Sequence, residues 1–149
     1  MKRRAAPLTL NVRGHMQTVI AQLLERNELV PKPLPKPTLE DIVRVEHELC
    51  IKLPAEFVAL QLSAGHVVCG TQEPVMVTLG SGHTYIGQVA NDAWSSGVPR
   101  EYLPICADNG DYFCLTPEGK VVYWSHNGPT QECWPSLEAW VSKVWLSGL

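Results

Sequence analysis

One stretch of the sequence, the most regular in the chain, reads Leu103-Pro104-Ile105-Cys106-Ala107-Asp108-Asn109-Gly110-Asp111-Tyr112-Phe113-Cys114-Leu115. It predicts two strands, Leu103–Ala107 and Asp111–Leu115, because Asp108-Asn109-Gly110 between them are the residue types of a tight hairpin turn. Thr116–Gly119 has proline at the second and glycine at the fourth position of another turn, and Lys120–Trp124 follows as a third strand. Two successive hairpins predict an antiparallel meander.

The residues after this meander predict a further turn, a short strand and a closing helix. His126–Pro129 is rich in turn-forming residues, and Gln131–Trp134 is expected to add a strand. Ser136 is a residue type that caps helices, and apolar residues recur after it at helical spacing. The inward-facing residues of this helix are expected to be Leu137, Trp140, Val141 and Val144.

Residues 66–101 have a less regular pattern. In Pro74–Leu79, the residues Val75, Val77 and Leu79 alternate with Met76 and Thr78, which predicts a short strand. Gly80–Gly82 is then a turn, and Tyr85–Ala90 is a second predicted strand. Residues 91–101 are polar and contain glycine and proline, which predicts a loop or a short helical turn.

The first 65 residues predict helices. Residues 13–30 have apolar residues three and four apart and must leave the helical conformation before Pro31. Pro31–Pro37 has proline at every second position without the PxxP spacing of SH3 ligands, so it predicts an extended spacer. Thr38 can cap the next helix, Pro54 can open a third, and Gly65 is expected to close that helix in the left-handed conformation.

The order of helices, then strands, then a helix predicts an α+β fold. We expect an antiparallel sheet of about four to six strands, packed by N-terminal helices and one C-terminal helix. The predicted division places a helix and proline-rich lead-in at residues 1–37 and the α+β domain at residues 38–149.

Charge is distributed unevenly along the chain. Residues 1–52 contain nine Lys or Arg and six Asp or Glu, a net charge of +3, whereas residues 53–149 contain three and nine, a net charge of −6. Such an acidic part repels nucleic acid and attracts basic proteins. An equally simple interpretation is a solvated surface that keeps the protein soluble.

The cysteines and the N-terminal residues indicate a cytoplasmic protein. The five cysteines are odd in number and widely spaced, with no CxxC pair, which favours reduced, buried thiols over a zinc site or a disulfide framework. Lys2-Arg3-Arg4 is not followed by an apolar segment of signal-peptide length, and no stretch approaches the roughly 18 apolar residues of a membrane span.

The sequence offers no pattern of catalytic or metal-binding residues. The five histidines have no HxxxH spacing, and no GxSxG motif is present. Asp108–Asp111 superficially resembles a calcium loop, but position twelve of that loop would be Gly119, and a hairpin turn explains the same residues. We therefore predict a protein that is not an enzyme, with no cofactor, no metal and no small-molecule substrate.

Four segments in order resemble the SUKH superfamily, the Smi/Knr-type immunity and regulatory proteins. They are the opening over residues 38–46, 53–57 and 63–65, the central hairpin over residues 103–115, its continuation over residues 119–124, and the closing helix over residues 134–140. The resemblance covers residues 38–149. Ser63-Ala64-Gly65 departs from it, since relatives more often have an Asn-Gly step there.

The resemblance implies protein binding without catalysis. Bacterial members neutralise polymorphic toxins, often nucleases or deaminases, by direct contact, and we expect such an immunity function for this chain. The alternative is a regulatory or scaffold protein that binds an endogenous partner. The predicted contact residues are Asp108, Asp111, Tyr112, Glu118, Tyr123 and Trp124, although the three aromatic residues could equally be packed within the sheet.

Overall fold

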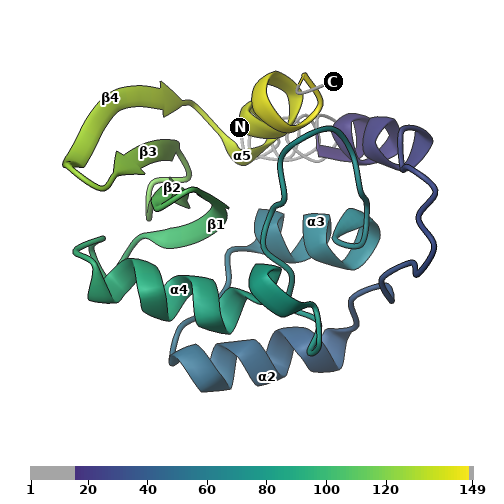
Figure 1. The fold of residues 1–149 in the computed structure, drawn as a ribbon, viewed down its shortest axis with the longest axis horizontal. Coiled ribbons are helices and arrows are strands. Elements are labelled where there is room, and N and C mark those ends of the chain that lie inside the picture. The colour runs from purple at the N-terminus through teal and green to yellow at the C-terminus, as the bar shows by residue number, and fades with distance from the viewer. Residues whose placement is uncertain (1–15, 148–149) are drawn as a thin grey trace, which may run out of the picture.

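The computed structural model describes residues 16–147 and has the predicted α+β architecture (Figure 1). A helix over residues 16–25 comes first, and the start of the predicted helix at residues 13–15 lies outside the described residues. The elements that follow are α2 (Leu39–Leu49), α3 (Ala55–Ala64), the single turn η2 (Gly82–Thr84), α4 (Ile86–Ser95), β1 (Leu103–Asp108), β2 (Asp111–Leu115), β3 (Val121–Ser125), β4 (Gly128–Trp134), α5 (Leu137–Trp140) and its wider continuation η3 (Val141–Trp145).

The four strands form one antiparallel meander in the order β1-β2-β3-β4. The turn between β1 and β2 has positive φ angles at Asn109 (52°) and Gly110 (91°), the conformation that this residue pair adopts at low cost. The hairpins predicted over residues 103–124 are therefore confirmed. The predicted strand at Gln131–Trp134 is also confirmed and begins three residues earlier, at Gly128.

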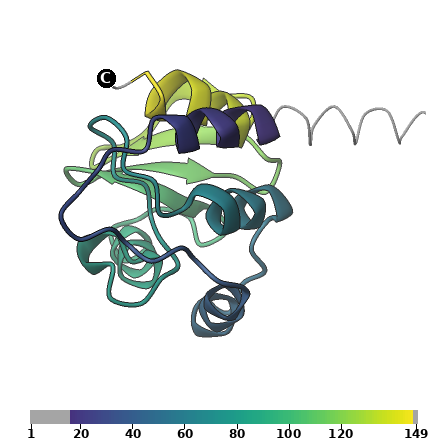
Figure 2. The same cartoon turned by 90° about the vertical axis from the view of Figure 1, so that its right-hand side faces the viewer.

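The sheet lies between two sets of helices (Figures 1 and 2). The helix over residues 16–25 and α5 cover one face, and α4 packs against the other face along β1. The first face holds an aromatic cluster in which the Phe113 ring centroid lies 5.4 Å from that of Trp140 and 5.6 Å from that of Trp134. Met16, Val19 and Leu23 belong to the same buried core, so the first helix is part of the packed structure. The predicted boundary between residues 37 and 38 stays a prediction.

Two helix caps follow the sequence prediction. The Thr38 hydroxyl accepts a hydrogen bond from the backbone N–H of Asp41, and the Asp41 carboxylate accepts one from the Thr38 N–H, which completes a capping box at α2. The Ser136 side chain accepts from the Ala139 N–H at the start of α5. These caps are local chemistry, so the sequence alone sufficed to predict them.

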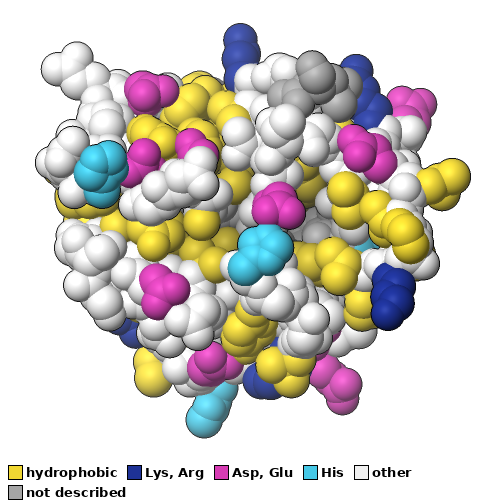
Figure 3. Space-filling model, viewed as in Figure 1, with side chains coloured by type: hydrophobic (Ala, Val, Ile, Leu, Met, Phe, Trp, Pro, Cys, Tyr) yellow, Lys and Arg dark blue, Asp and Glu magenta, His cyan; other side chains and the backbone are white. Residues whose placement is uncertain are grey.

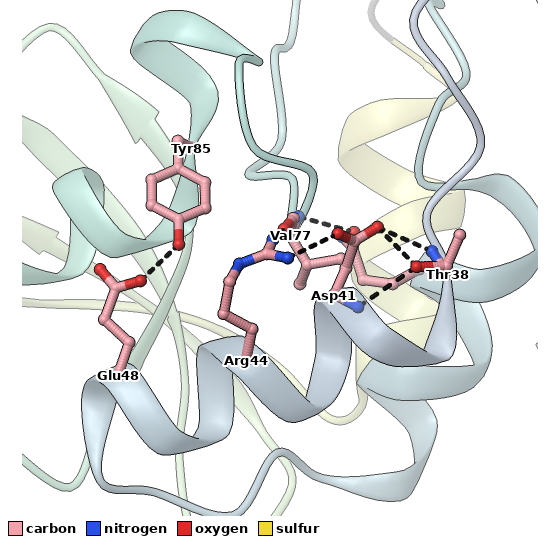
Figure 4. A network of polar contacts seen from close by, with 7 residues as sticks. Thr38, Asp41, Arg44, Glu48, Val77 and Tyr85 are labelled. Atoms are coloured by element: carbon pink, nitrogen blue, oxygen red, sulfur yellow. Dashed lines mark hydrogen bonds and ion pairs between the residues drawn. The ribbon is translucent and has the colours of Figure 1, made fainter.

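A polar network on α2 holds the connection between residues 77 and 85 (Figure 4). Arg44 pairs with Asp41 at 3.0 Å and donates to the carbonyl of Val77 at 2.8 Å. One turn further along α2, Glu48 accepts from the Tyr85 hydroxyl at 2.5 Å. Burial disfavours the Asp41 carboxylate, but hydrogen bonds from Thr38 and Arg44 outweigh it and lower the pKa of Asp41.

The predicted strand at Tyr85–Ala90 is wrong. These residues begin α4, which continues to Ser95 through the segment predicted as a loop or short turn. Ile86, Val89, Ala90 and Ala93 are all buried, and their spacing is that of one helix face. Six residues of mixed pattern fit either a strand or a helix, and packing on β1 selects the helix.

Two further predictions in this region need correction. Pro74–Leu79 is not a strand: it makes isolated bridges, from Pro74 to Cys106 and from Met76 to Tyr85. Gly65 does close α3, but in the right-handed conformation with a φ of −63°. A Cβ at Gly65 would lie 2.7 Å from the Gln61 carbonyl oxygen, so this glycine is needed for close packing and not for a left-handed turn.

Candidate protein-binding surface

Three of the six predicted contact residues meet at one end of the sheet. The Tyr123 hydroxyl lies 2.9 Å from Oδ2 of Asp108 and 2.9 Å from Oδ2 of Asp111. Oδ1 of Asp111 accepts from the backbone N–H of His126 at 2.8 Å and lies 2.9 Å from its ring Nδ1. The two hairpin turns at this end of the sheet therefore form one anionic cluster, defined here as Asp108, Asp111, Tyr123 and His126.

The contacts within the anionic cluster favour its charged carboxylate. Hydrogen bonds from the His126 ring and backbone, and then from Tyr123, lower the pKa of Asp111. Burial and the two neighbouring carboxylates raise the pKa of Tyr123, so its hydroxyl keeps the proton that it donates. Asp111 is consequently a fixed negative charge, held in place by the turn opposite to it.

Tyr112 and Trp124 lie on the other face of the sheet. They are directly opposite each other on β2 and β3, and both are half-buried. The rings of Trp124 and Tyr102 are nearly perpendicular, with an interplanar angle of 83° and a centroid distance of 6.1 Å. Side chains of successive residues on a strand point to opposite faces, so these two rings are separated from the ring of Tyr123.

Glu118 is exposed at the opposite end of the sheet, in the turn between β2 and β3. The six predicted contact residues thus separate into the end cluster, the pair of rings and this single carboxylate. Over the strands, on the left of Figure 3, hydrophobic side chains stand beside acidic ones.

His126 was not predicted as a member of the site. The register of β2 and β3 is the information that would have identified it. Once Tyr112 pairs with Trp124, Asp111 at the start of β2 lies beside the turn that follows β3 and contains His126. The isolated sequence gives only a histidine in a turn, a residue type that is usually solvated there.

A separate groove of about 400 Å³ lies at the Glu118 end of the sheet. Its lining is mainly apolar and includes Ile51, Leu103 and Leu115. The Arg100 guanidinium lies 3.9 Å above the Trp94 ring centroid and also donates to the Leu49 carbonyl. Arg100 is therefore already held by interactions within the chain.

The structure shows no group of three or more His, Cys, Asp and Glu side chains within residues 16–147 that could hold a metal ion. All five cysteines are free, and burial raises the pKa of Cys106 and of Cys114 to about 12. Within the same residues, none of the helices has the length and apolar character required to cross a bilayer.

Comparison with known proteins identifies the family. Residues 16–146 match the family SUKH_5, described as SMI1-KNR4 cell-wall. The chain belongs to this SUKH family. A similar solved structure, titled as a crystal structure of a protein from Pseudomonas syringae pv. tomato, is 44% identical, with a TM-score of 0.83 over 88% of this chain and 98% of that one. No functionally curated protein matches the chain. The resemblance inferred from the sequence is confirmed, and the family is compatible with a protein-binding module.

Proposed function

We propose that this SUKH protein is a non-enzymatic, cytoplasmic immunity protein that neutralises a cognate bacterial toxin by direct binding. The toxin is a polymorphic toxin of the nuclease or deaminase class. Binding blocks either its active site or the surface that receives its substrate.

The observation that carries the proposal is the anionic cluster at the end of the sheet. Its carboxylates are held by Tyr123 on β3 and by His126 in the following turn, so they lose little side-chain freedom when another protein binds them. The Tyr123 hydroxyl and the His126 backbone N–H donate to Asp111 at 2.9 and 2.8 Å, so the Asp111 carboxylate has a fixed orientation before any partner arrives. Family membership supports a protein as the partner.

Charge supports the class of toxin. Enzymes that act on nucleic acid carry basic surfaces that bind phosphates. Residues 53–149, which include the whole sheet, have a net charge of −6, because they contain three Lys or Arg and nine Asp or Glu. Opposite charges on the two proteins accelerate their association, and the same acidic surface repels other acidic proteins.

The test is co-expression with the toxin-like protein encoded beside this gene. We expect a stable complex by affinity capture and size-exclusion chromatography, and survival of cells that otherwise die when the toxin is expressed. Asp108→Asn combined with Asp111→Asn should weaken binding and decrease its sensitivity to salt, because less of the remaining affinity comes from screened charge attraction. A matched control removes two exposed carboxylates elsewhere, Glu25→Gln with Glu40→Gln, and should bind like the wild type.

A toxin that neither binds nor is neutralised would rule out the immunity function. The alternative is a regulatory or scaffold protein with an endogenous partner. Capture of a chromosomally encoded housekeeping protein that depends on Asp108 and Asp111, in a genome without an adjacent toxin gene, would establish that alternative.

A further inference from the structure

Two rows of side chains cross the sheet on the face that carries Trp124. The first row is Ala107, Tyr112, Trp124 and Pro129, which are paired in register from β1 to β4. The second row is Pro104, Cys114, Val122 and Cys133. All eight residues are apolar, whereas an antiparallel sheet face that meets water normally carries polar side chains.

Exposure in the second row increases toward the β4 edge. Pro104 and Cys114 are buried, Val122 is half-buried, and Cys133 is exposed. In the first row, Ala107 and Pro129 at the two ends are exposed, and Tyr112 and Trp124 between them are half-buried. The second row is therefore covered at β1 and open at β4, whereas the first row is accessible along its whole length.

The position of α4 explains this gradient. The helix packs mainly on β1, where Ala93 forms a small buried cluster with Val98 and Cys114. The helix over residues 16–25 and α5 lie on the opposite face (Figure 2). Within residues 16–147, no helix lies above the apolar side chains of the open part of the sheet, β3 with β4.

Two carboxylates lie close enough to this open face to affect the pKa of Tyr112. Burial raises the pKa of the Tyr112 hydroxyl most, and the negative charges of Asp92 on α4 and of Asp111 raise it further. Of the three cations after residue 52, Arg100 is stacked on Trp94, Lys120 is at the other end of the sheet, and Lys143 is in η3, beyond α5. An aromatic and apolar surface beside fixed carboxylates complements a cation that has an apolar stem.

We infer that this face is the docking surface for the partner, and that its occupant is an arginine of a basic partner protein, stacked on Trp124 beside Tyr112. This docking mode presupposes the proposed function and names the chemistry that the toxin presents. Arginine fits better than lysine because its planar guanidinium stacks on aromatic rings while its remaining N–H groups can reach carboxylates. The same pairing occurs within the chain, where the Arg100 guanidinium lies 3.9 Å from the Trp94 ring centroid.

The first experiment measures toxin affinity by calorimetry for the full-length wild type and three variants. Ala107→Lys places a like charge at an exposed end of the first row, and Trp124→Leu removes the aromatic ring while keeping an apolar side chain. Val43→Lys is the control: it adds the same charge at an apolar residue of α2 that is 58% exposed, away from the sheet. Circular dichroism and thermal unfolding confirm that each variant is folded.

We expect Ala107→Lys and Trp124→Leu each to weaken binding by roughly tenfold or more, and Val43→Lys to have no effect. Equal affinity of all four proteins would overturn the docking surface while leaving the immunity function intact. A wild type that fails to bind the toxin would contradict the proposed function itself.

A second experiment assesses the face without the toxin. The probes are the peptides nona-arginine and nona-lysine, which carry the same charge but differ in their ability to stack on an aromatic ring. Each peptide is titrated into the protein, and the NMR shift of the Trp124 indole N–H resonance is compared between the two. A larger shift with nona-arginine, abolished by Ala107→Lys, is expected. Equal shifts with the two peptides, or shifts confined to residues away from Trp124, would refute the assignment of arginine to this surface.

Discussion

Gln61 provides the most direct test of how this fold is held together. Its side chain is 3% exposed, and it spans the gap between α3 and the irregular segment at residues 75–77. Nε2 donates to the Val75 carbonyl at 2.9 Å, and Oε1 accepts from the Val77 N–H at 3.3 Å. One amide thus serves two backbone groups, as a neighbouring strand would.

Gln61→Leu keeps a similar side-chain volume and leaves both backbone groups buried without this partner. Each such group costs about 1–3 kcal/mol, and the added apolar contact offsets part of the loss, so we expect a decrease of about 2–4 kcal/mol in the free energy of unfolding. For a chain of this size that decrease corresponds to a fall in Tm of roughly 5–15 °C.

The assay is urea unfolding followed by tryptophan fluorescence, which gives the midpoint and the slope. Gln88→Leu is the control, since the Gln88 side chain is exposed on α4 and donates to Asp92 four residues along; this substitution should change the free energy of unfolding by less than about 0.5 kcal/mol. An unchanged midpoint for Gln61→Leu at constant slope would refute the assigned role of the amide. Gln61→Glu should make stability depend on pH. The protonated carboxyl of this variant can still donate to the Val75 carbonyl, so its folded-state pKa should be raised, and stability should fall as pH rises through that value.

Three further outcomes follow from single contacts. Gly65→Ala should lower the free energy of unfolding by about 1–3 kcal/mol, as urea unfolding will measure, because its Cβ would overlap the carbonyl and side chain of Gln61. His126→Ala should raise the pKa of Asp111 toward 3.8, as NMR titration of the carboxyl carbon will measure. Because that pKa is depressed in the folded protein, the stabilisation by Asp111 should be present above pH 3.8, be lost as pH falls through the folded-state pKa, and be absent in Asp111→Asn. Thr38→Ala should cost about 1 kcal/mol of unfolding free energy in thermal denaturation, through loss of the α2 cap, whereas Thr38→Ser should cost much less.

The candidate surface was predictable only in part. The residue types of the hairpin turn placed Asp108 and Asp111 close together, and the structure confirms that proximity by joining both to Tyr123. The strand pattern could not show that Tyr112 and Trp124 face away from this cluster as a pair. A shift of one residue in register would reverse the faces, and only the assembled sheet fixes it.

By itself, the sequence determined the elements that depend on neighbouring residues. Asn109-Gly110 sets a hairpin, and Thr38 and Ser136 cap helices, because the required φ angles and hydrogen bonds lie within a few residues. Tertiary structure decided the rest. Residues 86–95 form a helix because their apolar side chains are buried against β1 in the folded protein. Gln61 bonds to two backbone groups that lie 14 and 16 residues away in the chain. The tertiary structure also left an apolar sheet face open beside β4. These outcomes depend on burial between distant segments, whose free energy no short stretch of the chain contains.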